Sequence, residues 1–94
     1  MTIVWSPEAA DDLDTAVAYL MERNVDAARR LSAAVFALVD VLAIEPMDGP
    51  AQVLANGEEV RSWPLPPFRV YYRRSGEDIL VVRVYHQRRA PLAR

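Results

Sequence analysis

Two segments in the first half of the chain carry apolar residues at helical spacing. After Ser6 and Pro7, which suit the cap and first turn of a helix, the apolar positions are Ala9, Leu13, Ala16, Val17 and Leu20. A second helix is predicted from Asn24–Asp26 to just before Pro46, with the apolar stripe Ala28, Leu31, Val35, Leu38, Val39 and Leu42. Because only a short break separates them, these segments predict an antiparallel helical hairpin.

The second half of the chain has the residue pattern of strands. β-branched and aromatic residues separated by turn signals predict strands at residues 60–65, 68–74 and 79–86, and residues 52–54 are a candidate for one more short strand. The run Thr2–Trp5 predicts a further strand, buried on both faces, before the first helix. Short connections between the last strands favour an antiparallel meander. We therefore expect an α+β fold of order β-α-α-β-β-β, with the helical hairpin packed on one face of an antiparallel sheet.

Alternation with period two assigns the side chains of the last two strands to the two faces of the sheet. The side facing the helices is expected to take the core residues Phe68, Val70, Tyr72, Leu80, Val82 and Val84. The opposite side is expected to carry Arg69, Tyr71, Arg73, Ile79, Val81, Arg83 and Tyr85. A sheet face that mixes arginine, tyrosine and aliphatic groups is a candidate binding surface.

Composition narrows the chemistry of this surface. The 94 residues fit one small domain, without cysteine and with a single histidine. Thiolate metal sites, disulfides and two-histidine metal sites within one chain are therefore excluded, and we expect neither a metal nor a cofactor. We also expect a cytoplasmic protein without a membrane segment, because no basic leader precedes the first acidic residues and no apolar run approaches ~20 residues.

The net charge of −2 hides a strong asymmetry along the chain. Residues 1–59 carry eleven acidic and three basic residues, whereas residues 60–94 carry two acidic and eight basic ones. All the basic residues are arginines, which grip carboxylates and phosphates in a planar, bidentate way; GC-rich codons would give the same bias. The net negative charge argues against a general nucleic-acid binder, while the basic half is compatible with a focused patch.

Short motifs over nearly the whole chain follow the order found in one family. They are Val4–Ala9, Asp12-Leu13, Tyr19-Leu20, Asp26–Ala28, Glu45-Pro46, Val60-Arg61, Phe68–Tyr72 and Val82–Arg89. With these motifs the chain resembles ParE-type toxins of the RelE/ParE superfamily. The resemblance implies one toxin domain over residues 1–94, with the strand and helix order expected above. It also implies a type II toxin–antitoxin pair, in which a ParD-like antitoxin neutralises the toxin within a hetero-oligomer.

The resemblance implies two alternative activities. ParE-like members inhibit DNA gyrase, whereas RelE-like members cut mRNA on the ribosome without metal. Such cleavage needs a general base, a cation for the phosphate and an acid. Arg69 and His86 match the arginine and histidine of some relatives, but the lysines of RelE and a clear glutamate are missing. Since alternation puts these two residues on opposite faces, we favour gyrase inhibition and keep the endonuclease as the alternative.

The residues expected to contact the antitoxin or the target share a positive charge or an aromatic ring in the last strands and the tail. They are Arg61, Arg69, Tyr71, Arg73, Arg83, Tyr85, Arg88 and Arg89. In the tail the family often has an arginine, an aspartate and a proline, but Ala90 stands in the place of the aspartate. A third interpretation is a plain interaction module that dimerises through its helical hairpin.

Overall fold

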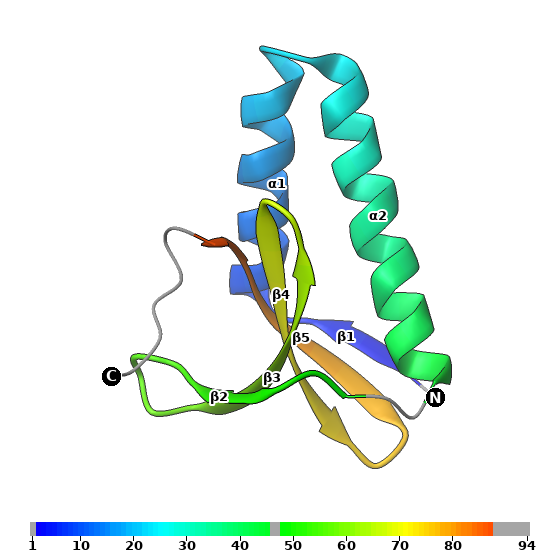
Figure 1. Ribbon diagram of the computed structural model, residues 1–94, viewed down its shortest axis with the longest axis vertical. Helices are drawn as coiled ribbons and strands as arrows, with labels where there is room; N and C mark the ends of the chain where they lie inside the picture. The colour runs from blue at the N-terminus through cyan, green and yellow to red at the C-terminus, as the bar shows by residue number, and fades with distance from the viewer. Residues whose placement is uncertain (1, 46–47, 88–94) are drawn as a thin grey trace.

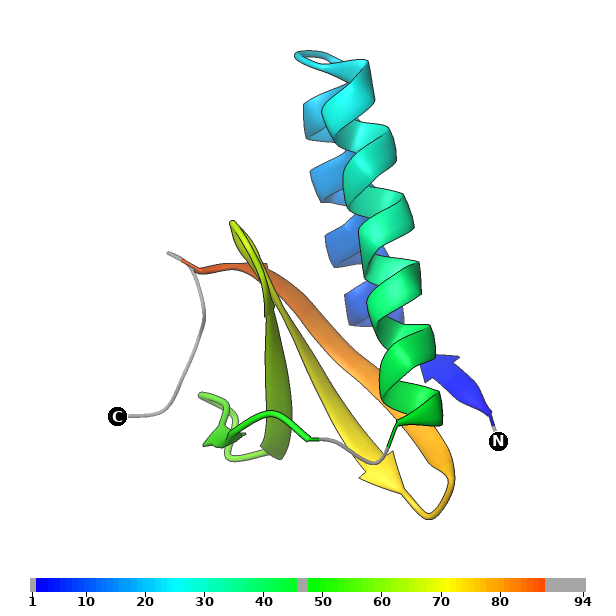
Figure 2. The same ribbon diagram turned by 45° about the vertical axis from the view of Figure 1, so that its right-hand side comes forward.

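The computed structural model describes residues 2–45 and 48–87, which form two helices and a five-stranded sheet (Figure 1). The elements are β1 (Ile3–Trp5), α1 (Pro7–Met21), α2 (Val25–Ile44), β2 (Ala51–Val53), β3 (Glu59–Leu65), β4 (Phe68–Ser75) and β5 (Asp78–His86). The predicted α+β class and the order of helices and strands are confirmed. In Figures 1 and 2 the helical hairpin stands on one side of the sheet, and its closed end extends beyond the sheet.

Both helices begin at side-chain caps that the sequence predicts. The Ala9 amide donates to Ser6 Oγ at 3.0 Å, and the Ala27 amide donates to Asn24 Oδ1 at 3.0 Å. Each cap satisfies one of the amides that the first helical turn leaves without an intrahelical partner. The Ser6 hydroxyl also donates to the Val82 carbonyl at 2.7 Å, so the start of α1 is fixed against β5.

The sheet is mixed rather than wholly antiparallel. Its strand order is β1-β5-β4-β3-β2, and β1 runs parallel to β5 while the other neighbours are antiparallel. The predicted meander is therefore confirmed. The wholly antiparallel sheet is not observed, because β5, the last strand of the meander, lies beside β1 and runs in the same direction. The expectation that this strand is buried on both faces is wrong: β1 lies at an edge, and Val4 is 47% exposed.

A β-bulge reverses the predicted faces of the first half of β5. Tyr71 pairs with Arg83 while the next residue, Tyr72, pairs with Val81, so Val82 is the extra residue. Before the bulge, Ile79 and Val81 face the helices, and after it Val84 does so. The assignment of Val84 is confirmed, whereas that of residues 79–82 is wrong, because strict alternation cannot anticipate a bulge.

The sheet separates two apolar clusters. The larger cluster lies between the hairpin and the sheet, and its most buried members include Ala9, Val35, Val39, Leu42, Val70, Tyr72, Ile79 and Val81. A smaller cluster covers the far face of the sheet and consists of Leu54, Val60, Tyr71 and Val82, with Leu80 and Tyr85 packed against it. The far face is therefore partly a second core and not the open mixed surface that alternation predicts.

Candidate functional site

Arg83, a predicted contact residue, is held by an acidic residue of α1. Its Nε donates to Asp12 Oδ2 at 2.7 Å and its second terminal nitrogen to Oδ1 at 2.8 Å, which makes a bidentate ion pair. The Val84 amide donates to the same carboxylate at 2.9 Å. The hydrogen bonds with Asp12 raise the pKa of Arg83, although partial burial opposes this. The pair therefore joins α1 to β5 and engages the Arg83 guanidinium within the chain, while the binding role of Arg83 stays a prediction.

Two tyrosines pack beside this ion pair on the far face of the sheet. The Arg83 guanidinium carbon lies 4.2 Å from the centre of the Tyr85 ring, and that ring meets Tyr71 edge-on with centroids 5.8 Å apart. Tyr71 is fully buried, so the expectation that its side chain lies on an exposed face is wrong, and its binding role stays a prediction. Burial raises the pKa of both tyrosines, against the nearby arginine charge in each case. Tyr85 is half-buried, and its binding role stays a prediction.

Of the three arginines expected on the far face of the sheet, only Arg73 is exposed rather than half-buried. Arg69 is half-buried, and its guanidinium donates to Ser62 Oγ at 2.8 Å. Ser62 is fully buried and donates in turn to Gln52 Oε1, so the Arg69 side chain belongs to a network linking β2, β3 and β4. Arg73 is exposed on the same face. Arg69 and Arg83 are less exposed because both have partners within the chain.

Arg69 and His86 lie on opposite sides of the sheet. The β4–β5 register pairs Phe68 with His86 and Arg69 with Tyr85. The His86 ring contacts Phe68 on the helix side, with ring centroids 5.5 Å apart. The Arg69 side chain points to the far side, where it meets Ser62. The two residues of the endonuclease alternative therefore do not face a common substrate position.

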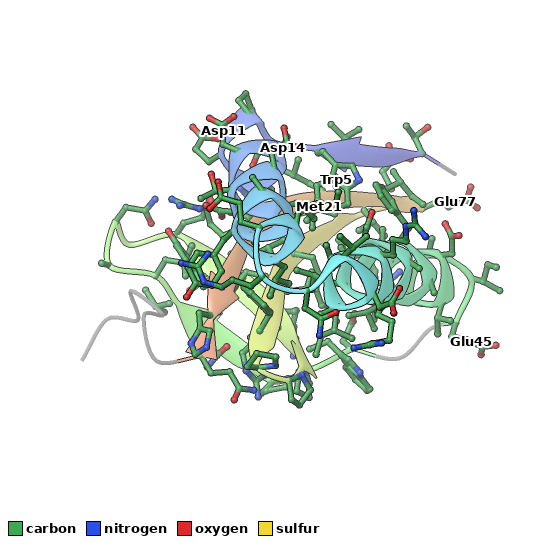
Figure 3. All side chains as sticks on the ribbon, turned by 90° about the horizontal axis from the view of Figure 1, so that it is seen from above. Trp5, Asp11, Asp14, Met21, Glu45 and Glu77 are labelled. Carbon is green, nitrogen blue, oxygen red and sulfur yellow. The ribbon has the colours of Figure 1, made fainter. Side chains whose placement is uncertain are left out.

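A groove of about 720 Å³ lies between α1 and the adjacent ends of β4 and β5. Its lining is mainly apolar, with acidic groups at the rim, and consists of Asp11, Asp12, Thr15, Ala16, Tyr19, Leu20, Pro67, Phe68, Val84, Tyr85 and His86. Figure 3 shows Asp11 on the side of α1 that points away from α2. At the same rim, the Arg23 guanidinium lies 3.6 Å from the centre of the Tyr19 ring and fixes it. The groove is open to a partner with an elongated apolar surface.

A second, smaller cavity of about 400 Å³ lies on the far face of the sheet. Its lining residues are Ser6, Glu8, Leu54, Ala55, Asn56, Glu58, Leu80, Val82, Arg83 and Tyr85. Leu54 and Val82 belong to the second apolar cluster, while Glu8 and Glu58 add negative charge. The cavity joins that cluster to the Asp12–Arg83 pair.

The connection between α2 and β2 is fixed by residues that sequence reasoning missed. Arg74 donates to Asp48 Oδ1 at 3.0 Å and to the Leu42 carbonyl at 2.9 Å, which satisfies a carbonyl near the end of α2. The Gly49 amide donates to the Tyr72 hydroxyl at 2.9 Å, and Arg61 donates to the Gly49 carbonyl at 3.3 Å. Arg61, a predicted contact residue, thus has a structural partner on the helix side of the sheet.

Comparison with known proteins decides the family. The family model described as the ParE toxin of the type II toxin–antitoxin system parDE matches residues 3–91. The chain belongs to the ParE toxin family. A solved structure described as the chromosomal ParDE TA system from P. aeruginosa aligns with a TM-score of 0.69 at 25% identity, covering 92% of this chain and 95% of that one. No curated protein gives a significant sequence match.

For this ParE-family chain, the remaining expectations concern the tail arginines, a metal site and a membrane segment. Arg88 and Arg89 lie outside the described residues. Within residues 2–45 and 48–87, no three histidine, aspartate or glutamate side chains gather where they could hold a metal ion. Over the same residues, neither helix is long and apolar enough to cross a bilayer. The resemblance to ParE-type toxins is confirmed, while the binding roles of individual residues stay predictions.

Asp12, which accepts hydrogen bonds from Arg83 and the Val84 amide, is a residue of the candidate site that the sequence did not single out. It stands within an acidic run with Asp11 and Asp14, and nothing in the local pattern separates it from a solvent-facing neighbour. Its partner Arg83 is 71 positions away. A signal existed only in the family motif, because Asp12-Leu13 and Val82–Arg89 both belong to the resemblance to ParE-type toxins.

Proposed function

We propose that this toxin inhibits DNA gyrase and is neutralised by a cognate ParD-like antitoxin. The choice of gyrase over mRNA as the target rests on the separation of Arg69 and His86 by the sheet. The Arg69 guanidinium donates to Ser62 Oγ on the far side, while His86 lies on the helix side. A metal-free ribonuclease needs its cation and its acid or base around one phosphate. A toxin that acts by binding a protein has no such requirement. The ParE family match supports the same choice.

The groove beside α1 is the proposed antitoxin site. Its floor is apolar at Ala16, Leu20 and Phe68, and its rim carries the Asp11 carboxylate and the Tyr19 ring. An amphipathic helix can lay its apolar face into a groove of this kind, with a basic residue beside Asp11. The similar P. aeruginosa structure is described as a ParDE toxin–antitoxin system, which supports an antitoxin partner for this chain.

Two activity assays distinguish the proposed target from its alternative. Purified toxin is added to a gyrase supercoiling reaction and to a ribosome programmed with a defined mRNA. We expect loss of supercoiling and an intact mRNA. His86→Ala should keep its toxicity in cells, because a binding toxin needs no general base, whereas loss of a true base costs ~10²–10⁴-fold in rate. Ribosome-dependent cleavage that disappears in a folded His86→Ala variant would establish the endonuclease instead.

The antitoxin site is tested separately by binding kinetics. Tyr19 is 57% exposed at the groove rim, and Tyr19→Ala should weaken antitoxin binding by ~30-fold, as expected when an aromatic side chain that a partner buries is truncated. Ala16→Glu, which places a charge on the groove floor, should weaken binding further. Arg73→Ala on the far face is the matched control and should bind normally. Unchanged affinity in both groove variants, with Arg73→Ala impaired, would move the antitoxin to the far face.

A further inference from the structure

Helix α2 has apolar residues on two opposite sides. One side packs into the main core through Leu31, Val35, Val39 and Leu42. The other side is exposed from the middle of the helix to its end, and we call it the outer α2 face: Ala33, Phe36, Ala37, Asp40, Val41 and Ile44. Phe36 is 50% exposed and Ile44 is 70% exposed. At 3.6 residues per turn, Ala33, Ala37, Asp40 and Ile44 lie roughly opposite the core stripe, and Phe36 and Val41 lie on the two flanks of this face.

Apart from Trp5 of β1, which packs against Phe36, no described strand or helix covers the outer α2 face, as Figure 2 illustrates. A helix that is apolar on all sides is normally buried on all sides. Asp40 is the sole charge on this part of the helix surface; Phe36 lies four positions before it, and Val41 and Ile44 are three positions apart. Scattered exposed apolar residues need no explanation, but a contiguous group on one helix face indicates a protein contact.

The charges around this face are arranged for a second copy of the same chain. Arg30 lies five positions before position 35 and Asp40 lies five positions after it, both exposed. In an antiparallel pair of α2 helices crossing at position 35, Arg30 of each copy meets Asp40 of the other. A twofold contact requires this reciprocity, since each residue pair occurs twice. Arg29 adds a second basic group beside the same carboxylate.

We propose that two copies of this toxin associate through their outer α2 faces, antiparallel and centred near position 35. The small residues Ala33 and Ala37 lie at the centre and permit close approach of the helices, at the ~8 Å end of the usual range. Phe36 lies next to the twofold axis, so the two Phe36 rings meet. Trp5 supports this ring from behind, with centroids 5.4 Å apart.

This dimer leaves the proposed antitoxin groove open. The groove is formed by α1 and the ends of β4 and β5, and none of its lining residues belongs to α2. Dimerisation therefore adds to the proposed function without depending on it, and a toxin pair can carry two antitoxins. An antitoxin segment seated on the outer α2 face is the competing occupant, but it has no reason to require the matched spacing of Arg30 and Asp40.

Sedimentation of the toxin alone, and of its antitoxin complex, tests the proposal. At about 50 μM we expect a toxin dimer that Phe36→Asp converts to a folded monomer. Arg30→Asp and Asp40→Arg each replace two ion pairs with two like-charge pairs, so each should weaken the dimer by at least ~100-fold. Mixing the two variants should restore dimers, because the heterodimer regains both opposite-charge pairs. Arg73→Asp, exposed on the far face of the sheet, is the matched control and should leave the dimer intact.

Each remaining outcome overturns the proposal. A wild-type toxin that stays monomeric at this concentration excludes the dimer. A dimer that persists in Phe36→Asp and in both charge variants uses another surface. Failure of the mixed charge variants to associate refutes the antiparallel register. Loss of antitoxin from the complex in these variants, with the toxin monomeric throughout, would assign the outer α2 face to the antitoxin.

Discussion

Asp12→Ala should strongly destabilise the toxin, although the residue lies in an acidic run on a surface helix. Its carboxylate accepts two hydrogen bonds from Arg83 and one from the Val84 amide. The substitution leaves a half-buried cation without its partner and a backbone amide without an acceptor. The side chains of Asp12 and Arg83 are 15% and 30% exposed, so water compensates for part of the loss but not for all of it.

The size of the effect follows from these contacts. A hydrogen bond to a charged group contributes about 1.5–3 kcal/mol, and an unsatisfied buried amide costs about 1–3 kcal/mol. Allowing for the ability of the Arg83 side chain to turn towards solvent, we expect a loss of about 2–4 kcal/mol in the free energy of unfolding. For a domain of this size that corresponds to a decrease of roughly 10–25 °C in Tm.

Urea and thermal unfolding, followed by circular dichroism, measure this loss. Asp12→Asn keeps an acceptor for the Val84 amide and should lose less than Asp12→Ala. The double variant Asp12→Ala/Arg83→Leu removes the stranded cation and should be more stable than Asp12→Ala alone. A single variant within about 0.5 kcal/mol of the parent, or a double variant in which the two losses simply add, would refute the clamp between α1 and β5.

Three further substitutions test contacts that surround the sheet. The buried Tyr71 hydroxyl has no hydrogen-bond partner among the described residues, so Tyr71→Phe should change the free energy of unfolding by less than about 0.5 kcal/mol. Tyr72→Phe loses the hydrogen bond that the Gly49 amide donates, so it should lower the free energy of unfolding by about 1–2 kcal/mol. Burial raises the pKa of both tyrosines, so above about pH 10 the unfolded state loses these protons before the folded state does. The free energy of unfolding of the parent should therefore fall as pH rises above about 10. Urea titrations should show a smaller fall in either phenylalanine variant. Gly49→Ala should cost at least about 3 kcal/mol, because its Cβ would lie 1.7 Å from the Ser62 carbonyl oxygen; near-parental thermal stability would show that the connection can move.

The helices were predictable from the sequence because their signals are local. Ser6 and Asn24 cap their helices through bonds to amides three residues ahead, and the core stripes repeat at the helical period. The meander was equally accessible, since prolines mark one of its turns and glycines the other two, at positive φ of 88° at Gly57 and 61° at Gly76. These features depend on residues a few positions apart, which a sequence pattern records directly.

The candidate site was less accessible because it depends on long-range geometry. One bulged residue, Val82, exchanges the faces of four positions in β5, and no period-two pattern contains that information. The same tertiary arrangement brings Arg83 onto Asp12 and Arg69 onto Ser62, and so gives two arginines of the predicted binding face partners within the chain. The sequence by itself determined the family, the element order and the helical part of the main core. Only the tertiary structure decided which charged and apolar groups remain available to a partner, because that depends on whether another part of the chain has already paired with or covered them.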